Sequence, residues 1–260
     1  MNPRITAIGS GKGGTVKTLI SVSLAHALAH QNERVLLCDA DLGLSNASVQ
    51  LGIKEGGDLP RLLAGKTPLK NAVTNVPCGP RHSFDLLAAP AGSGTFANAG
   101  EAAAMTLIAA FEGARHYDRV LIDLSAGVEA AVMSFAARAD ETLLVLTPDP
   151  ASLTDAYAFT KLMLRRTGAR APQVLVNMAL NGTEGRRIAD TLLAAVQSFL
   201  KIVPDYVGYI PYDARVADAV RRQTPLLSAY PQTPASLAID TLARKLHSAI
   251  NMPQSAIGLR

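Results

Sequence analysis

The stretch GSGKGGTVKT, residues 9–18, decides how the rest of this 260-residue chain is interpreted. It follows a short apolar run at residues 5–8 and precedes an apolar-periodic segment at residues 19–29. A strand, a glycine-rich turn and a helix in this order bring backbone N–H groups and the positive end of the helix dipole together. The stretch therefore predicts a loop that holds phosphate.

Two lysines in this loop have different expected roles. Lys17 would contact the β- and γ-phosphates of a nucleotide, and the hydroxyl of Thr18 would be a ligand of Mg²⁺. Lys12 is either a solvated charge or a group that acts across a dimer interface, as an arginine finger does. The loop residues that we predict to bind the nucleotide are Gly11, Lys12, Gly13, Gly14, Thr15, Val16, Lys17 and Thr18.

Val16 departs from the standard pattern, in which glycine precedes the lysine. Glycine accepts a positive φ and lets the backbone approach phosphate closely. A β-branched residue held at positive φ is strained by roughly 1–3 kcal/mol. At about 1.4 kcal/mol per tenfold change, this strain would weaken nucleotide binding by about one to two orders of magnitude. Alternatively, the turn relaxes and the protein works without nucleotide.

Short β-rich runs alternate with helical patterns along the chain, which favours βαβ units and a parallel sheet. Strands are expected at residues 5–8, 34–39, 84–88, 117–124, 141–147, 173–178 and 205–210. Helices are expected at residues 16–30, 101–114, 128–138, 152–166, 184–200 and 234–250, with small pieces up to residue 69 and one helix that carries Arg221 and Arg222. We predict one α/β domain over residues 1–260, a P-loop NTPase-like sandwich with a mostly parallel sheet flanked by helices, and residues 234–260 as its terminal helix and tail.

Polar side chains end several of these strands: Asp39 and Asp41, Asp123, and Asn177. Ligands of open parallel sheets bind beyond the carboxyl ends of the strands, so these residues should meet the phosphate loop at one edge. Asp123 is expected to hold Mg²⁺ through a water, or else to cap the helix that follows it. Asn177 would hydrogen-bond the adenine edge or cap the end of its strand.

Asp39 and Asp41 lie two positions apart, so in an extended chain their side chains face the same side. One of them could approach the metal while the other orients the attacking water. The alternative for each is a turn aspartate that accepts hydrogen bonds from its own backbone. We favour a functional role for Asp41 and leave Asp39 open.

Composition narrows the class of protein. The formal charge is +4 and the basic residues are scattered, so direct nucleic-acid binding is not expected. Cys38 is expected in a buried strand and Cys78 in a Pro/Gly turn, and neither shows metal-ligand spacing, which fits a reducing compartment. We expect no signal peptide, and no apolar run reaches the roughly 18 residues that span a bilayer. The expected location is the cytoplasm.

A stripe of apolar residues recurs at steps of three and four near the C-terminus: Ile239, Leu242, Leu246 and Ile250. This stripe is typical both of an interfacial membrane helix and of a terminal core helix. We favour core packing, because the accompanying basic cluster is small.

Several segments resemble a known family. The pattern Lys12-Gly13-Gly14-x-x-Lys17-Thr18 resembles the deviant phosphate loop of the MinD/ParA ATPases, in which the early lysine reaches the partner's nucleotide. Residues 39–46 (DADLGLSN) resemble the switch segment of the MinD branch, and residues 123–127 (DLSAG) resemble its Asp-Thr-Pro-Ala-Gly. Residues 147–157, 176–178, 184–187, 210–213 and 219–227 are similar to the FlhG group of that branch, also called FleN or YlxH.

This resemblance implies a homodimeric switch that binds ATP and Mg²⁺ and controls the number and placement of bacterial flagella. The implied catalytic residues are Lys12, Lys17 and Asp41, and the implied metal-site residues are Thr18, Asp123 and Asp39. Partners would be a flagellar transcription activator of the FleQ type and the GTPase FlhF, with reversible attachment to the inner membrane. Because the chain shows no N-terminal extension of the kind that activates FlhF, we expect no such activation.

Two alternatives remain open at this stage. One is a nucleotide-independent interaction protein on the same fold, and the other, weaker one is a ParA-like partition ATPase with nonspecific DNA binding. The sequence also leaves open whether Val16 permits ATP hydrolysis.

Overall fold

The computed structural model describes residues 2–41, 46–54, 56–89 and 100–250. Its strands are β1 (Arg4–Gly9), β2 (Val35–Ala40), β3 (Thr74–Pro77), β4 (Ser83–Leu87), β5 (Arg119–Leu124), β6 (Glu141–Leu146), β7 (Gln173–Ala179) and β8 (Asp205–Pro211). Its helices are α1 (Lys17–His30), α2 (Ala47–Gln50), α3 (Leu59–Leu63), α4 (Leu69–Ala72), α5 (Gly100–Glu112), α6 (Ala130–Arg138), α7 (Pro150–Met163), α8 (Gly182–Leu200), α9 (Ala214–Arg221), α10 (Leu226–Ala229) and α11 (Pro234–Ile250).

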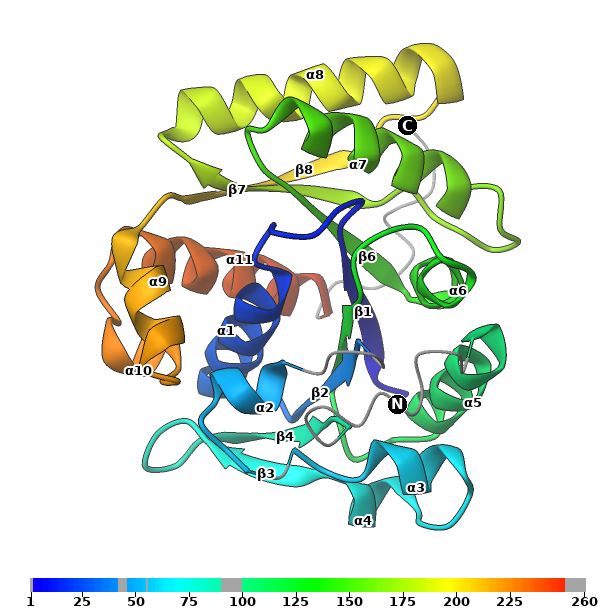
Figure 1. The fold of residues 1–260 in the computed structure, drawn as a ribbon, viewed down its shortest axis with the longest axis vertical. Coiled ribbons are helices and arrows are strands. Elements are labelled where there is room, and N and C mark those ends of the chain that lie inside the picture. Colours follow the sequence, from blue (N-terminus) through cyan, green and yellow to red (C-terminus); the bar gives the residue numbers. More distant parts are fainter. Residues whose placement is uncertain (1, 42–45, 55, 90–99, 251–260) are drawn as a thin grey trace.

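The strands form one sheet in the order β3-β4-β2-β5-β1-β6-β7-β8. All neighbouring strands are parallel except β3 and β4, which are antiparallel. Helices cover both faces of the sheet (Figure 1). Every residue of β2, β5 and β6 is buried, as expected for strands covered on both faces. The predicted fold class, a mostly parallel α/β sandwich, is confirmed.

The sequence did not predict β3. This strand has four residues, and only Val76 among them is buried. It lies at the edge of the sheet, pairs only with β4 and ends in Pro77, so it lacks the apolar run that marks the inner strands. The short helix α10 was missed for a similar reason, because four residues carry no periodic pattern.

The terminal helix α11 packs into the core on the α1 side of the sheet. Ile239, Leu242 and Leu246 are each at most 3% exposed, and α11 makes extensive contacts with α1 and β8. The core interpretation of this stripe is therefore confirmed for these three residues. The side chain of Ile250 and the tail at 251–260 lie outside the described residues. Within the described part of the chain, no helix has the length and apolar character needed to cross a membrane.

A buried arginine at the amino edge of the sheet fastens α11 in place. Arg119, at the start of β5, is fully buried and donates to Glu33 Oε2 (3.0 Å) and Glu141 Oε1 (2.5 Å). It also donates to Thr6 Oγ1 (2.8 Å) and to the carbonyl oxygen of Leu246 in α11 (2.8 Å). The guanidinium thus joins the sheet to the last turns of the terminal helix.

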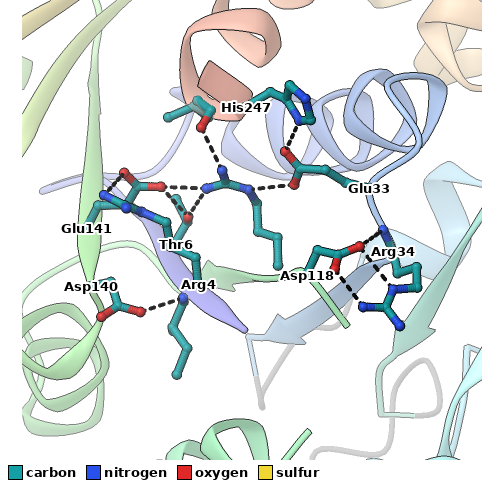
Figure 2. A network of polar contacts seen from close by, with 11 residues as sticks. Arg4, Thr6, Glu33, Arg34, Asp118, Asp140, Glu141 and His247 are labelled. Atoms are coloured by element: carbon teal, nitrogen blue, oxygen red, sulfur yellow. Dashed lines mark hydrogen bonds and ion pairs between the residues drawn. The ribbon is translucent and has the colours of Figure 1, made fainter. Parts of the chain in front are cut away.

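His247 adds a second contact between α11 and this network. Its Nδ1 lies 2.7 Å from Glu33 Oε1, and Figure 2 shows His247 at the outer side of Glu33, whose other oxygen accepts from Arg119. Nearby, Arg34 makes a two-pronged contact with Asp118, but this pair is exposed. Arg119 and Arg34 therefore form a buried and an exposed ion pair in the same region of the molecule.

Candidate functional site

Three strand ends bring the predicted site residues together. β2, β5 and β1 are neighbours in the sheet, and both Asp39 of β2 and Ile8 of β1 lie opposite Asp123 of β5. The phosphate loop follows β1 at this same edge, and α1 starts from it (Figure 1). The predicted convergence of the loop with Asp39 and Asp123 is present.

The glycines of the loop serve two purposes. A Cβ on Gly11 would lie 2.3 Å from the backbone of Asp155, so the loop can approach α7 only with glycine at this position. At Gly13 and Gly14 a Cβ would meet no heavy atom within 4 Å, which leaves open space beside the backbone. Gly14 also has φ +79°, a conformation that side chains rarely adopt. The loop is therefore packed on one side and open on the other.

Val16 occupies the left-handed region that the sequence predicts for it, with φ 62° and ψ 34°, immediately before α1. A β-branched residue there is strained by roughly 1–3 kcal/mol. Its side chain is half-buried and packs against the apolar cluster between α1 and the sheet, which offsets part of this strain. The turn at Val16 has thus kept the positive φ that glycine adopts. It has not relaxed, as we considered for a protein that works without nucleotide.

Lys17 is buried at the start of α1, among the carboxylates of the three strand-end aspartates. Burial lowers the pKa of Lys17, and that shift is opposed by the charges of Asp123, Asp41 and Asp39. An ammonium group with little access to water interacts strongly with the charges around it. The position of Lys17 suits it to a multiply charged anion such as a phosphate chain.

Asp123 accepts a hydrogen bond from Ser21 Oγ at 2.8 Å and is 1% exposed. Burial and the neighbouring charge of Asp39 raise the pKa of the Asp123 carboxyl, although a hydrogen bond from Thr18 opposes this. Two buried carboxylates side by side, with a threonine hydroxyl, form an oxygen-rich site in which a divalent cation would relieve the repulsion. The alternative role of Asp123 as a helix cap is wrong, because the N-cap position of the next helix, α6, is Glu129.

Asp39 organises the chain that follows β2. Its carboxylate accepts hydrogen bonds from the backbone N–H groups of Asp41 (3.1 Å), Asn46 (2.9 Å) and Ala47 (2.9 Å). These contacts correspond to the turn-aspartate alternative, and they place Asp41 beside the carboxylate cluster. The metal role of Asp39 stays a prediction. Residues 42–45 of the switch segment lie outside the described residues.

Lys12 forms an ion pair within its own chain. Its Nζ forms a short ion pair with Asp149, the residue that caps α7, and this contact lowers the pKa of the Asp149 carboxyl. Both side chains are partly exposed, at 31% and 47%. An exposed ion pair contributes at most about 1 kcal/mol, so this contact can be exchanged for another at little cost.

We expect Asp149→Asn to release Lys12 and to strengthen any contact that Lys12 makes with a second molecule by up to about fivefold. Asparagine also caps helices, so α7 should stay intact. The measurement is the dimerisation constant in Mg-ATP by analytical ultracentrifugation. Asp205→Asn, which removes an exposed carboxylate at the start of β8, is the control. Weaker dimerisation of Asp149→Asn would contradict the expectation.

Asn177, at the end of β7, is 5% exposed, and its Nδ2 donates to the carbonyl oxygen of Thr15 at 2.9 Å. This contact links the phosphate loop to β7, so Asn177 positions the loop, and its role at the adenine edge stays a prediction. Beside it, the buried Thr15 Oγ1 has no hydrogen-bond partner within the described part of the chain. A buried hydroxyl of this kind is satisfied when a polar ligand or a water reaches it.

These observations test whether a magnesium nucleotide fits. The loop is open at Gly13 and Gly14. The buried ammonium group of Lys17 and the hydroxyl of Thr15, which has no partner among the described residues, can donate hydrogen bonds at this loop. The neighbouring carboxylates of Asp39 and Asp123 repel each other. The donors match a phosphate chain and the acceptors match Mg²⁺. The residues therefore fit both groups.

Three features of this site were not predicted from the sequence: Ser21 as a partner of Asp123, Asp149 as a partner of Lys12, and the contact of Asn177 with the loop. Ser21 lies three positions after Thr18 on a helix, so both hydroxyls share one face, and this spacing was the available signal. The other two contacts join residues more than 130 positions apart and have no local signal.

Comparison with known proteins places this arrangement among nucleotide-binding domains. Residues 6–226 match the family model described as the CobQ/CobB/MinD/ParA nucleotide binding domain. The antiactivator FleN of Pseudomonas aeruginosa is 38% identical over 250 residues, which cover 95% of this chain and 88% of that protein. The flagellum site-determining protein YlxH of Helicobacter pylori is 29% identical, over 96% of this chain and 83% of that protein.

Solved structures show the same fold. A chain of the MinC:MinD cell division protein complex of Aquifex aeolicus superimposes with a TM-score of 0.74 at 26% identity, covering 99% of this chain and 98% of that chain. MinD of Pyrococcus horikoshii, solved with Mg-ADP, superimposes with a TM-score of 0.77 at 24% identity, covering 95% and 97% of the two chains.

Proposed function

Because the chain belongs to the CobQ/CobB/MinD/ParA nucleotide-binding family, we propose that it is a MinD-type, ATP-dependent switch that regulates flagellar number and placement and flagellar gene expression. The proposal that the chain binds a nucleotide rests on the buried ammonium group of Lys17, which lies among three aspartates beside a glycine loop with open space. The proposal that the chain regulates flagella rests on its similarity to FleN and YlxH.

Each residue of the site would have its own role. Lys17 and the N–H groups of the loop hold the phosphates, and Thr18 with Asp123 and Asp39 holds Mg²⁺. Bound Mg²⁺ would supply neutralising charge for the phosphate oxygens. Asp41 orients the attacking water. Hydrolysis on this scheme depends on positioning and charge stabilisation rather than on a covalent intermediate.

Lys12 would exchange Asp149 for the nucleotide of a second copy. In the described structure its amine is occupied by an exposed carboxylate of its own chain, a contact that is weak enough to be replaced. A phosphate chain carries more negative charge than one carboxylate and competes well for the ammonium group. Binding of ATP thereby favours the homodimer, and loss of the γ-phosphate removes the advantage.

The partner that we propose is a flagellar transcription activator of the FleQ type, which the chain would restrain in its ATP-bound form. The name of the FleN relative, an antiactivator, supports this choice. We place the GTPase FlhF second, as a partner in flagellar placement. Any attachment to the inner membrane would not use Ile239, Leu242 and Leu246, since these side chains are buried against the core.

Complementation tests this function. In the source bacterium, deletion of the gene should change the number of flagella per cell, and a wild-type copy should restore it. A copy with Lys17→Ala should not restore it, whereas Lys66→Ala, an exposed lysine far from the loop, should. Normal flagella in the deletion strain would contradict the flagellar role, and full rescue by Lys17→Ala would favour the nucleotide-independent alternative.

We expect Val16→Gly to have a free energy of unfolding about 1–2 kcal/mol higher than that of Val16→Ala, because glycine removes a left-handed strain of roughly 1–3 kcal/mol and its greater freedom in the unfolded chain offsets about 0.5–1 kcal/mol. Alanine is the matched control, because it keeps the positive-φ strain and also lacks the two methyl groups of valine. The strain predicted from the sequence to weaken nucleotide binding is present in the turn without nucleotide, so the affinity of the two variants for Mg-ATP should differ by less than about threefold. Urea denaturation measures the stability, and isothermal titration calorimetry measures the affinity. A gain of tenfold or more in ATP affinity for glycine over alanine would mean that nucleotide binding, and not folding, imposes the strain.

A further inference from the structure

A group of metal-ligating side chains lies at the end of α1 remote from the phosphate loop. His26 and His30 are four positions apart on α1 and so share one helix face. Cys78 and His82 lie in the turn that joins β3 to β4, which is closed by a hydrogen bond from the Cys78 N–H to the His82 carbonyl oxygen (2.9 Å). The ligand atoms of His26, His30 and Cys78 all lie within 4.8 Å of one another.

His26 gives an independent indication of a ligand. Its ring is 2% exposed, and its Nδ1 is buried without a hydrogen-bond partner among the described residues. A buried polar nitrogen without a partner is unfavourable, and a metal bond would satisfy it.

The other two imidazoles face the same small space. The His30 ring centroid lies 4.7 Å from that of His26 and 4.8 Å from that of His82. A Cβ on Gly79 would lie 3.3 Å from His30 Nε2 and 3.8 Å from His82 Nδ1, so both nitrogens border this glycine. His30 Nε2 lies 2.6 Å from the carbonyl oxygen of Cys78, so His30 would either exchange this contact for a metal bond or bind the metal through Nδ1. The thiol of Cys78 is buried and forms no disulfide. His82 therefore lies beside His30, and its ring would have to turn toward His26 and Cys78 to act as a fourth ligand.

We propose that His26, His30 and Cys78 bind one Zn²⁺, with His82 as the fourth ligand. Imidazole nitrogens with one thiolate are a donor set that Zn²⁺ prefers. Zn–N bonds of about 2.0–2.1 Å and Zn–S bonds of about 2.3 Å in a tetrahedron place ligand atoms about 3.3–3.6 Å apart. Starting from separations within 4.8 Å, rotamer changes of about an ångström bring the three central ligands into place.

Binding would change the protonation of one ligand. Burial raises the pKa of the Cys78 thiol to about 11, so the sulfur is protonated until the cation arrives. The incoming Zn²⁺ displaces this proton, and a Zn–S bond forms in place of the S–H bond, with one proton released to the solvent. No electron is transferred, so the step requires no oxidant or reductant.

The site has a structural rather than a catalytic design. All four coordination positions are filled by protein, which leaves none for a water or substrate. Zn²⁺ would tie the hairpin of β3 and β4 to the C-terminal end of α1. Thirteen residues separate Lys17 from His30, so at 1.5 Å per residue the metal lies about 20 Å from the phosphate loop. It would stabilise the hairpin without entering the nucleotide site.

Metal titration of the full chain tests this proposal. Zn²⁺ is titrated calorimetrically in excess Mg²⁺, which occupies the carboxylates of Asp39 and Asp123, and Co²⁺ is used in parallel as an optical probe. We expect one ion per chain and an ultraviolet thiolate-to-Co²⁺ absorption. Cys78→Ser and His30→Gln should each weaken Zn²⁺ binding by more than about 100-fold, above the loss typical of an outer-shell partner. Cys78→Ser should also abolish the thiolate absorption.

His116→Gln, which removes an exposed histidine outside the cluster, is the matched control and should bind Zn²⁺ as the natural chain does. Circular dichroism of the metal-free variants checks that they are folded. If His30→Gln does not fold, the test of the proposal rests on Zn²⁺ binding by Cys78→Ser. Absence of saturable binding at micromolar Zn²⁺ would overturn the proposal. So would equal binding in Cys78→Ser, or Co²⁺ binding without thiolate absorption, since either would indicate an adventitious surface site.

Discussion

Lys17→Ala should weaken Mg-ATP binding by at least about 100-fold, because two effects act in the same direction. A charge-assisted hydrogen bond to phosphate contributes about 1.5–3 kcal/mol, or roughly one to two powers of ten in affinity. The substitution also leaves the carboxylates of Asp39, Asp41 and Asp123 without the ammonium group that lies among them. These uncompensated charges would repel the incoming phosphates.

Calorimetric titration with Mg-ATP measures this loss, and Lys66→Ala, at an exposed position, serves as the control. Circular dichroism and the urea midpoint of Lys17→Ala establish that the chain is folded. Binding within about threefold of the natural affinity, a difference of less than about 1 kcal/mol, would mean that Lys17 does not contact the nucleotide. The whole assignment of the loop would then fail.

Arg119→Leu should lower the free energy of unfolding by about 3–5 kcal/mol. The guanidinium is fully buried and pairs with Glu33 and Glu141, which are themselves at most 4% exposed on their side chains. Removal of the arginine takes the central cation from two buried carboxylates and leaves the Leu246 carbonyl oxygen without its donor. Glu33 keeps only His247 as a partner, and Glu141 keeps Thr6 and the more distant Arg4. Urea denaturation followed by circular dichroism measures the change.

The exposed pair in the same region gives a matched control. Arg34→Leu breaks the contact with Asp118, and because this pair is exposed the expected loss is at most about 1 kcal/mol. Replacing Glu33 and Glu141 by glutamine in the Arg119→Leu background should recover part of the stability, since the buried carboxylate charges that lost the guanidinium are then gone. A loss for Arg119→Leu no larger than that for Arg34→Leu would show that the buried network does not hold α11 to the sheet.

Much of the fold could be predicted because its signals are local. The apolar runs of β2 and β5 are uninterrupted, that of β1 contains only Thr6 as a polar residue, and each leads into polar residues at the carboxyl edge of the sheet. The glycine pattern before α1 predicted the positive φ of Val16 as well as the strand-loop-helix order. These features depend on neighbouring residues, which is why one sequence was enough.

The features that were missed depend on pairing between distant segments. β3 exists because β4 offers an edge, not because residues 74–77 form a pattern of their own. Cys78 seemed to lack metal-ligand spacing, but its neighbours are His82 in the same turn and two histidines about fifty positions earlier on α1. The contact of Lys12 with Asp149 likewise spans 137 positions. Such contacts become visible only when the fold is known.

The central claim is that the loop binds ATP and that ATP drives two copies together through Lys12. Sedimentation velocity of the full chain in millimolar Mg-ATP, Mg-ADP and no nucleotide tests it most directly, with Lys12→Ala measured beside the natural protein. We predict a dimer in Mg-ATP, a monomer in the other two conditions, and a monomer in all three for Lys12→Ala. A natural chain that stays monomeric in Mg-ATP, or a Lys12→Ala variant that dimerises as well as the natural chain, would contradict the account.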